Sequence, residues 1–344
     1  MKKILFALSS PLIRNNGIVT FIRETTAILR AEGHQIDFIT DAEGEIDLRS
    51  YFDNYFRDSS SHNYQSMIKD GIPDVVEIPE MSNRIQELYS SISRAINYDI
   101  IISNDAQCTN ALYHSGKCVH YVHTAGLLPG KDYSFLNDSY IQFERYVMYK
   151  AKYVAVQSDN VAKLIGGSYN FITLGLTLEN IDQYLKQSSD SSNGILFVGE
   201  GTKRKGADKY ETVLGHLKGV TAKLMVTGTL EVDFKSLENV DMQTFASSDH
   251  SQKAEFIRGC QLQYFPSKGE VMPYGVLEAL LSIPVIVDEG YAWHTNVTEL
   301  GAIPTNDFTV EPTIRNMLRD NVYDPHLIID YFKNSKQQWI NFLK

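Results

Sequence analysis

The sequence is poor in cysteine and has no long apolar run. Three cysteines occur in 344 residues, at Cys108, Cys118 and Cys260, and none of them forms a C-x-x-C pair. This sparse, odd set argues against a disulfide framework and indicates reduced thiols in a cytoplasmic protein. No apolar stretch reaches the roughly 18 residues that a membrane helix needs. The start, MKKILFALSS, is too short in its apolar part for a signal peptide, so we interpret it as a β-strand.

Positive charge is also scarce. The chain has 42 acidic and 32 basic residues and a net charge of −10. This balance disfavours broad, non-specific attraction to nucleic acid or anionic lipid, although it leaves room for a local basic face. At 43% hydrophobic and 22% charged residues the composition is that of an ordinary globular protein. Its length makes two domains the default expectation.

Short apolar runs alternate with helical patterns along the whole chain. KILFAL, QIDFIT, YDIIIS and KYVAVQ are rich in β-branched residues, and the segments between them carry apolar side chains at helical spacing. Strands that alternate with helices predict parallel, doubly wound sheets. A serine-rich stretch at 183–194 is typical of a linker, and the same alternation begins again after it.

The pattern therefore predicts an α/β protein with two facing Rossmann-like domains and a central cleft. We expect a first domain at 1–180, a second domain at 181–325, and a C-terminal helix at 326–344 that packs back on the first domain. In such folds ligands bind at the carboxyl ends of the strands.

Two glutamates stand out in the stretch GEVMPYGVLEALLSIPVIV. Glu270 follows the expected strand QLQYFPS, and Glu278 comes after seven further residues, inside an apolar helical pattern. Two helical turns separate the two carboxylates, so they lie along one side of the helix. Ionised carboxylates suit the hydroxyls of a ligand, such as a diol, because each offers several acceptor sites. The start of the helix suits a phosphate.

This E-x7-E spacing resembles the donor-binding motif of retaining GT-B glycosyltransferases. Other segments resemble the same family in the same order: AEGHQIDFIT, VHYVHT, VAVQSDN and FVGEGTKRKG. The resemblance implies the GT-B fold and retaining transfer of a sugar from a nucleotide-sugar to an acceptor hydroxyl. It also implies that the domain at 1–180 binds the acceptor and the domain at 181–325 binds the nucleotide-sugar. We expect UDP-glucose or a UDP-pentose such as UDP-arabinose as the donor.

The resemblance also implies roles for particular residues. Glu270 would hold donor-sugar hydroxyls, helped by backbone amides near Tyr274, and Glu278 would hold the ribose. Lys205 would neutralise the leaving diphosphate. His123 would touch the donor sugar near its anomeric carbon. The other donor-binding residues that the resemblance implies are Asn16, Gly17, Gly199 and Arg204.

Two features bear on the diphosphate site. Glu200 stands where the family usually has arginine, so either this carboxylate turns away or Lys203 or Arg204 supplies the positive charge. The chain also has no Asp-x-Asp pair, which the metal-dependent alternative fold for sugar-nucleotide transfer uses as ligands. We therefore expect no metal and no cofactor.

Each candidate also has a simpler structural interpretation. Glu278 could pair with a buried base, and His123 could be a core histidine bonded to the backbone. The segment KRKG at 203–206 could be a solvated loop. Cys118 and Cys260 fit the core, because they sit in or beside apolar strands.

One segment narrows the choice of acceptor. SSHNYQS at 60–66 resembles a Ser-Ser-His-Asp-Tyr-Lys-Ser segment in the DNA α-glucosyltransferases of T-even phages, and GIVTF at 17–21 resembles their first helix. The favoured acceptor is then 5-hydroxymethylated cytosine in phage DNA, inside the host cytoplasm. The alternatives are a bacterial transferase that builds a surface polysaccharide or glycolipid and a non-catalytic sugar-nucleotide-binding protein. The acceptor-binding residues that we expect are Arg14, Arg57, His62, Tyr64 and Lys69.

Overall fold

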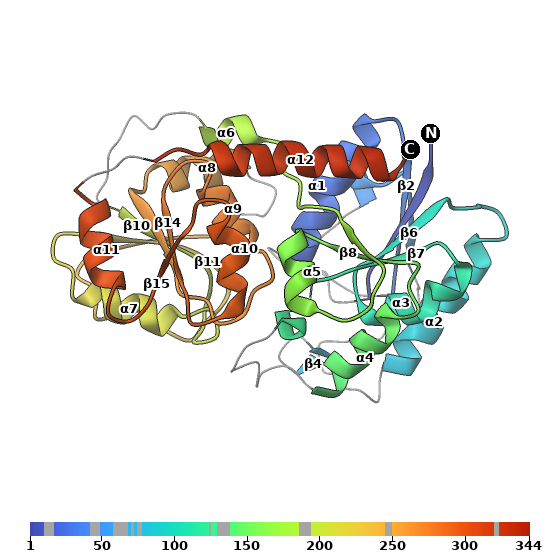
Figure 1. The fold of residues 1–344 in the computed structure, drawn as a ribbon, viewed down its shortest axis with the longest axis horizontal. Coiled ribbons are helices and arrows are strands. Elements are labelled where there is room, and N and C mark those ends of the chain that lie inside the picture. Colours follow the sequence, from blue (N-terminus) through green and yellow to red (C-terminus); the bar gives the residue numbers. More distant parts are fainter. Residues whose placement is uncertain are drawn as a thin grey trace. The chain divides into compact units, whose positions relative to one another are not determined.

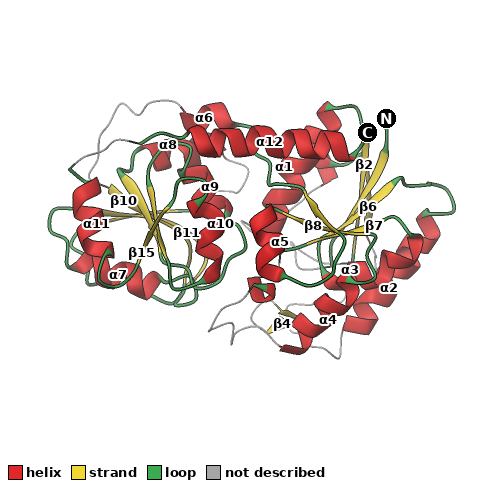
Figure 2. Ribbon diagram, viewed as in Figure 1, coloured by secondary structure: helices red, strands yellow, loops and turns green. Residues whose placement is uncertain are grey.

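The computed structural model describes residues 1–9, 17–41, 49–57, 68–69, 72–73, 78–123, 125–128, 138–185, 194–244, 250–319 and 323–344. The chain divides into two compact units. The first comprises Met1–Glu179 together with Asn334–Lys344, and the second comprises Asn180–Lys333. In each unit the strands form a central sheet with helices around it (Figures 1 and 2).

The first unit is built on a seven-stranded sheet of order β3-β2-β1-β6-β7-β8-β9, in which neighbouring strands run parallel. Its strands are β1 (Lys3–Ala7), β2 (Gln35–Thr40), β3 (Asn54–Arg57), β6 (Ile100–Ser103), β7 (Cys118–Tyr121), β8 (Tyr153–Val156) and β9 (Phe171–Thr173). A separate two-stranded sheet joins β4 (Ile68–Lys69) to β5 (Ile72–Pro73). The helices are α1 (Gly17–Ala31), α2 (Ile78–Ile92), α3 (Ala106–Leu112), α4 (Asp138–Met148) and α5 (Asp159–Ile165), with short 3-10 turns at η1 (Arg49–Tyr51), η3 (Tyr113–Ser115) and η4 (Ala125–Leu127).

The last helix, α12 (His326–Phe342), begins in the second unit, and its residues from Asn334 onward belong to the first. Trp339 anchors this end of the helix. Its indole is fully buried, stacks on Tyr121 with 6.1 Å between ring centroids, and donates a hydrogen bond of 3.0 Å to the carbonyl of Gly175. The contact fixes the end of the chain against β7 and the segment that follows β9.

The second unit has a six-stranded parallel sheet of order β12-β11-β10-β13-β14-β15. The strands are β10 (Gly194–Gly201), β11 (Thr221–Leu230), β12 (Val240–Gln243), β13 (Leu262–Phe265), β14 (Val285–Asp288) and β15 (Ile303–Thr305). The helices are α6 (Ile181–Leu185), α7 (Ala207–Gly215), α8 (His250–Arg258), α9 (Tyr274–Ala279), α10 (Thr295–Thr298) and α11 (Val310–Met317), with a 3-10 turn at η5 (Ala292–His294). An aromatic cluster of Phe197, Tyr210, Phe234 and Tyr264 fills the core.

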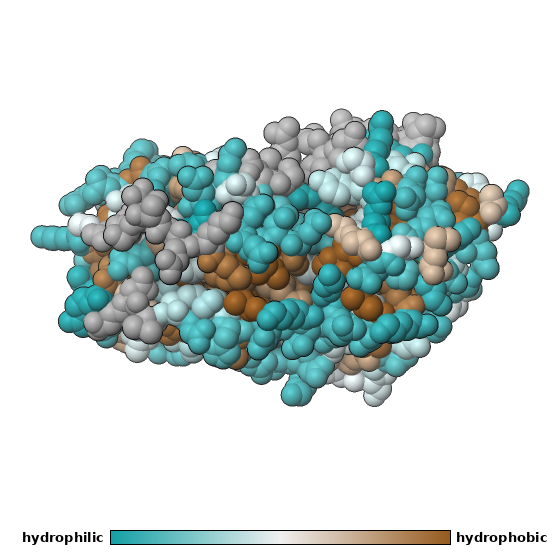
Figure 3. Space-filling model, turned by 90° about the horizontal axis from the view of Figure 1, so that it is seen from above, coloured by the Kyte–Doolittle hydropathy of each residue, from teal (hydrophilic) through white to brown (hydrophobic). Residues whose placement is uncertain are grey.

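The predicted α/β class with two Rossmann-like sheets is confirmed. Both sheets are parallel, as the alternation of strands and helices predicts. Cys118 and Cys260 are buried, as expected of core residues. Within the described ranges no helix is both long and apolar enough to span a bilayer. Figure 3 shows one face of the molecule, on which hydrophilic side chains predominate and hydrophobic ones occupy smaller areas between them.

Candidate active site

The candidate site lies at the carboxyl ends of β10 and β13, which are neighbours in the second sheet. The chain leaves β10 through a loop that leads into α7, and it leaves β13 through a loop that leads into α9. Because both strands point the same way, both loops emerge at the same edge of the sheet, the one formed by the carboxyl ends of its strands. Lys205 belongs to the first loop and Glu270 to the second.

Gly206 lets the two loops come into contact. Its φ is +73°, and a Cβ there would lie 2.2 Å from the carbonyl oxygen of Pro266, so only glycine fits. Beside it, the Lys268 amide donates a hydrogen bond of 3.0 Å to the carbonyl of Arg204. The residue that follows Lys205 is therefore held directly against the segment that carries Glu270.

Lys205 and Glu270 form an ion pair at this edge, between Nζ and Oε1. The Ser267 hydroxyl donates a second hydrogen bond, of 2.8 Å, to the same carboxylate oxygen. The two side chains are only 18% and 13% exposed. A group suited to phosphate and a group suited to sugar hydroxyls thus lie in contact, with little water between them to screen their charges.

The loop that carries Glu270 is fixed from below by two side chains that the sequence analysis missed. The buried Trp293 donates a hydrogen bond from Nε1 to the carbonyl of Ser267 at 3.0 Å. Asn296 donates one from Nδ2 to the carbonyl of Val271 at 2.7 Å. These backbone carbonyls would otherwise be buried without a partner, so both residues pin the loop on either side of Glu270.

The start of α9 packs closely on the end of β10. A Cβ on Gly275 would lie 2.7 Å from Cγ1 of Val198, so only glycine permits this approach. Tyr274, the first residue of the helix, is nearly buried at 9% exposure. Gly199 lies one residue beyond Val198, and the aliphatic part of Lys205 passes over it. Tyr274, Gly199 and Lys205 therefore share this edge with Glu270.

Glu278 lies on α9 and is buried, with 2% of its surface exposed. Glu270 precedes this helix, so the prediction that both carboxylates lie along one side of one helix is wrong. Lys253, on α8, places its Nζ 2.5 Å from Oε1 of Glu278. Tyr184, on α6, donates a hydrogen bond of 3.2 Å to the same oxygen. The structure therefore gives Glu278 the buried basic partner that its simpler interpretation expected. Its role toward ribose stays a prediction.

Glu200 and Arg204 also form a pair. Nη2 of Arg204 lies 2.8 Å from Oε2 of Glu200, and the two side chains are 35% and 39% exposed. Because the pair is so exposed, it adds little to stability. It does place a cation next to the carboxylate that stands where the family usually has arginine. Arg204, in the loop that follows β10, therefore compensates the charge of Glu200, near the end of that strand.

His123 lies in the first unit, just after β7. Its Nε2 is 3.2 Å from Oδ1 of Asn104, and its ring packs against Phe21 and Tyr121, with centroids 5.1 and 4.9 Å away. Burial, and to a smaller extent the nearby His120, lower the pKa of His123 to about 3. The imidazole is therefore neutral near pH 7, which suits a hydrogen bond to a hydroxyl better than an ion pair with phosphate. Its partner is a side chain, not the backbone of the core interpretation.

The remaining predicted residues are spread over the first unit. Gly17 begins α1, the helix that brings Phe21 to His123. Arg57 is the exposed last residue of β3, and Lys69 lies in β4. The other four predicted residues lie outside the described residues: Arg14, Asn16, His62 and Tyr64. The expected acceptor-binding cluster therefore stays a prediction.

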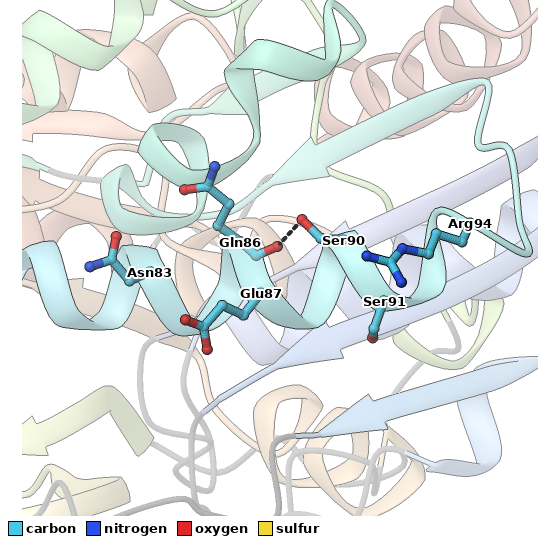
Figure 4. Close-up of a pocket in the computed structure, with 6 residues that line it drawn as sticks. All are labelled: Asn83, Gln86, Glu87, Ser90, Ser91 and Arg94. Carbon is cyan, nitrogen blue, oxygen red and sulfur yellow. Dashed lines mark hydrogen bonds between the residues drawn. The ribbon is translucent and has the colours of Figure 1, made fainter.

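A hollow of about 460 Å³ lies elsewhere, along one face of α2. Figure 4 shows its lining, in which the Ser90 hydroxyl donates a hydrogen bond of 2.7 Å to the carbonyl of Gln86. All of the lining residues are polar: five come from this helix and the sixth follows its end (Asn83, Gln86, Glu87, Ser90, Ser91 and then Arg94). None of them is a predicted site residue. In the part of the chain that the structure describes, no group of three His, Cys, Asp or Glu side chains could hold a metal ion.

No protein-family model and no curated protein sequence matches the chain. Solved structures do match it. Sucrose-phosphate synthase from Thermosynechococcus elongatus superposes with a TM-score of 0.72 at 13% identity, over 99% of this chain and 94% of that one. TarM from S. aureus gives 0.67 at 11% identity over 99% and 97%, and the lipopolysaccharide glycosyltransferase WaaG gives 0.64 at 14% over 98% and 95%.

The chain has the GT-B fold. The fold that the E-x7-E resemblance implies is thereby confirmed over almost the whole chain. Identities of 11–14% carry the fold alone. The closer resemblance to the DNA α-glucosyltransferases stays a prediction. The GT-B fold makes the carboxyl ends of β10 and β13 the place at which to look for the chemistry of the protein.

Proposed function

We propose that the protein is a retaining glycosyltransferase that uses a nucleotide-sugar donor. One observation carries this proposal: in a GT-B fold, Lys205 and Glu270 form an ion pair where β10 and β13 end. These are the two residues to which the resemblance assigns the diphosphate and the donor sugar. A non-catalytic binding protein with a degraded site would have no need to keep this pair, so we set that alternative aside.

In the proposed reaction the bond between the anomeric carbon and the diphosphate oxygen breaks, the acceptor oxygen bonds to that carbon, and the proton of the acceptor hydroxyl passes to the leaving diphosphate. Negative charge grows on the diphosphate as it leaves, and the Lys205 ammonium offsets that charge. Glu270 accepts hydrogen bonds from sugar hydroxyls, which fixes the sugar relative to the breaking bond. The backbone amides near Tyr274 assist it. No metal takes part in this scheme.

Two further residues complete the proposed donor site. Glu278 accepts hydrogen bonds from the ribose hydroxyls. His123, neutral near pH 7, exchanges a hydrogen bond with a donor-sugar hydroxyl near the anomeric carbon. Because a neutral imidazole can donate from one nitrogen and accept at the other, its contact with Asn104 orients the ring. Gly17 and Asn16, at and before the start of α1, would let the donor approach the backbone closely.

The comparisons favour a surface polysaccharide or a glycolipid as the acceptor. WaaG is described as a glycosyltransferase of lipopolysaccharide biosynthesis, and TarM was solved with α-GlcNAc-glycerol and UDP. We therefore take a bacterial surface glycan, free or lipid-linked, as the leading acceptor and UDP-glucose or a UDP-pentose as the donor.

A second acceptor is supported by one specific observation. The segment at 60–66 resembles the DNA α-glucosyltransferases of T-even phages, and Arg57, exposed at the end of β3, lies just before it in sequence. The second candidate function is therefore the glycosylation of 5-hydroxymethylated cytosine in DNA, with Arg14, His62, Tyr64 and Lys69 as further contacts.

A transfer assay tests the proposed function and separates the two acceptors. Radiolabelled UDP-glucose and UDP-arabinose are incubated with hydroxymethylated duplex DNA, unmodified DNA, a lipopolysaccharide core oligosaccharide and a lipid-linked saccharide. The product is then examined by NMR for the configuration at its anomeric carbon. We expect transfer to a saccharide with the anomeric configuration of the donor retained. Transfer only to hydroxymethylated DNA would select the second candidate, and an inverted product would contradict the retaining assignment.

A further inference from the structure

The buried partner of Glu278 points to a further residue of the donor site. Lys253 and Glu278 are 25 residues apart and lie on different helices, α8 and α9. Their side chains are 11% and 2% exposed, and Nζ lies 2.5 Å from Oε1. The neighbours of Lys253 on the buried face of α8 are Ala254, Phe256 and Ile257. A lysine is seldom buried in such surroundings unless it is paired with a carboxylate.

Lys253 is the counter-ion of the buried Glu278 carboxylate. A carboxylate that is withdrawn from water loses its hydration, and an opposite charge in direct contact offsets part of that loss. The carboxylate offers several acceptor sites, with which it can grip a diol.

The orientation of Glu278 is fixed by the same oxygen. Tyr184, on α6, donates a hydrogen bond of 3.2 Å to Oε1, and its hydroxyl also lies 3.2 Å from Nδ1 of His250, on α8. Both contacts of the carboxylate that involve described residues, from Lys253 and from Tyr184, therefore end on Oε1. Within the described part of the chain, Oε2 is the oxygen left to accept from a ligand.

We propose that Lys253 is a positioning residue for the ribose of the donor. It is the counter-ion of the Glu278 carboxylate and holds it by Oε1, so that Oε2 faces the ribose hydroxyls. This proposal rests on the proposed function, in which Glu278 binds ribose. The proposal goes beyond that function because it makes the affinity for the ribose hydroxyls depend on Lys253, a residue that does not touch the donor.

Binding of nucleotides with and without each ribose hydroxyl tests the proposal. UDP, ADP and GDP are titrated into the whole protein by calorimetry, and the tightest binder is compared with its 2′-deoxy and 3′-deoxy forms. A hydrogen bond from a hydroxyl to a charged group is expected to give the wild type a preference of about 10- to 100-fold over the analogue that lacks it. In Lys253→Met we expect this preference to fall below about threefold, because Glu278 loses its counter-ion and its anchor.

Three further variants control the result. Lys253→Arg keeps the charge and is expected to restore the preference. Lys223→Met removes the lysine of a matched ion pair, with Asp241 at 2.6 Å in the same unit, and is expected to leave the preference unchanged. Where Lys253→Met does not fold, Lys253→Gln replaces it. Gln keeps a donor to Oε1 without the charge, and we expect the preference to fall at least about threefold.

Each outcome has one meaning. A preference that survives in Lys253→Met, or in Lys253→Gln where that variant replaces it, would overturn the proposal, because the lysine would then serve the fold alone. A wild type that binds a nucleotide without any preference for its hydroxyls would remove the ribose role of Glu278 and this proposal with it. A wild type that binds none of the three nucleotides would contradict the proposed function itself.

Discussion

Lys205 and Glu270 are 65 residues apart in the sequence, and their side chains form an ion pair at one edge of the second sheet. Each side chain is the partner of the other, and each also has a proposed ligand group, the diphosphate for Lys205 and the donor sugar for Glu270. In the proposed donor complex Lys205 turns to the diphosphate and Glu270 to the sugar. Loss of either residue should therefore affect catalysis more than folding.

Replacement of Lys205 should lower the rate of transfer. In Lys205→Ala we expect kcat to fall by about 100- to 1,000-fold, because the charge that grows on the diphosphate loses its partner. In Glu278→Gln we expect a smaller fall in kcat, since ribose is bound before and during the reaction alike. Steady-state kinetics check both values, with Lys223→Ala as the control. If Lys205→Ala raised only KM, the lysine would bind the ground state and its proposed role would be wrong.

Gly206 should tolerate no side chain. A Cβ there meets the Pro266 carbonyl at 2.2 Å, whereas Gly219 has nearly the same φ, +74° against +73°, and nothing within 4 Å. We expect Gly219→Ala to lower the free energy of unfolding by about 1–2 kcal/mol through the left-handed backbone alone. Gly206→Ala should cost about 1–3 kcal/mol more through overpacking, and activity should fall with it. Urea unfolding measures both, and equal costs would show that the two loops do not meet as described.

His123 should make stability depend on pH. Its pKa is lowered from 6.5 to about 3 by burial and by His120, so between these values the unfolded chain binds a proton that the folded chain does not. Stability from this group is therefore present above pH 6.5 and is lost as the pH falls toward 3. We expect the free energy of unfolding to fall less steeply from pH 7 to 4 in His123→Gln than in the wild type. Parallel pH profiles would remove this explanation.

Glu200 should weaken binding of the diphosphate. Its carboxylate pairs with Arg204 and competes with a phosphate for that cation. In Glu200→Gln we expect affinity for UDP to rise about two- to fivefold, and in Arg204→Gln to fall by a similar factor, in line with the modest strength of exposed ion pairs. Calorimetry at two salt concentrations checks both, because screening should reduce each effect. A Glu200→Gln variant that bound UDP less well would show that the carboxylate does not oppose the diphosphate.

Local sequence was enough to predict the fold and the position of Glu270. The alternation of apolar strands and amphipathic helices follows from short-range periodicity, and the strand before Glu270 places it at a sheet edge. The same local pattern placed Glu278 on the buried helix but named no partner. Lys253 is 25 residues away on another helix, so only the tertiary fold reveals the pair.

Other contacts were beyond sequence for the same reason. Trp293 and Asn296 hold backbone carbonyls of the loop around Glu270, and such contacts have no signature in spacing. The linker expected at 183–194 begins too early, because α6 continues to Leu185. Tyr184 explains this difference. It is fully buried and reaches Glu278, so tertiary packing stabilises a helical turn in a stretch whose polar composition predicted none.

We propose above all that Lys205 and Glu270, at the carboxyl ends of β10 and β13, bind and activate a nucleotide-sugar. The most direct test is the release of UDP from UDP-glucose, measured with and without a chelator in the wild type, Glu270→Gln and Lys223→Ala. We expect the wild type to release UDP and a chelator to leave that release largely unchanged. In Glu270→Gln we expect kcat/KM to fall about 10- to 100-fold, because a charged hydrogen bond is lost, and in Lys223→Ala we expect little change. Release of UDP by Glu270→Gln at the wild-type rate would show that Glu270 does not bind the donor.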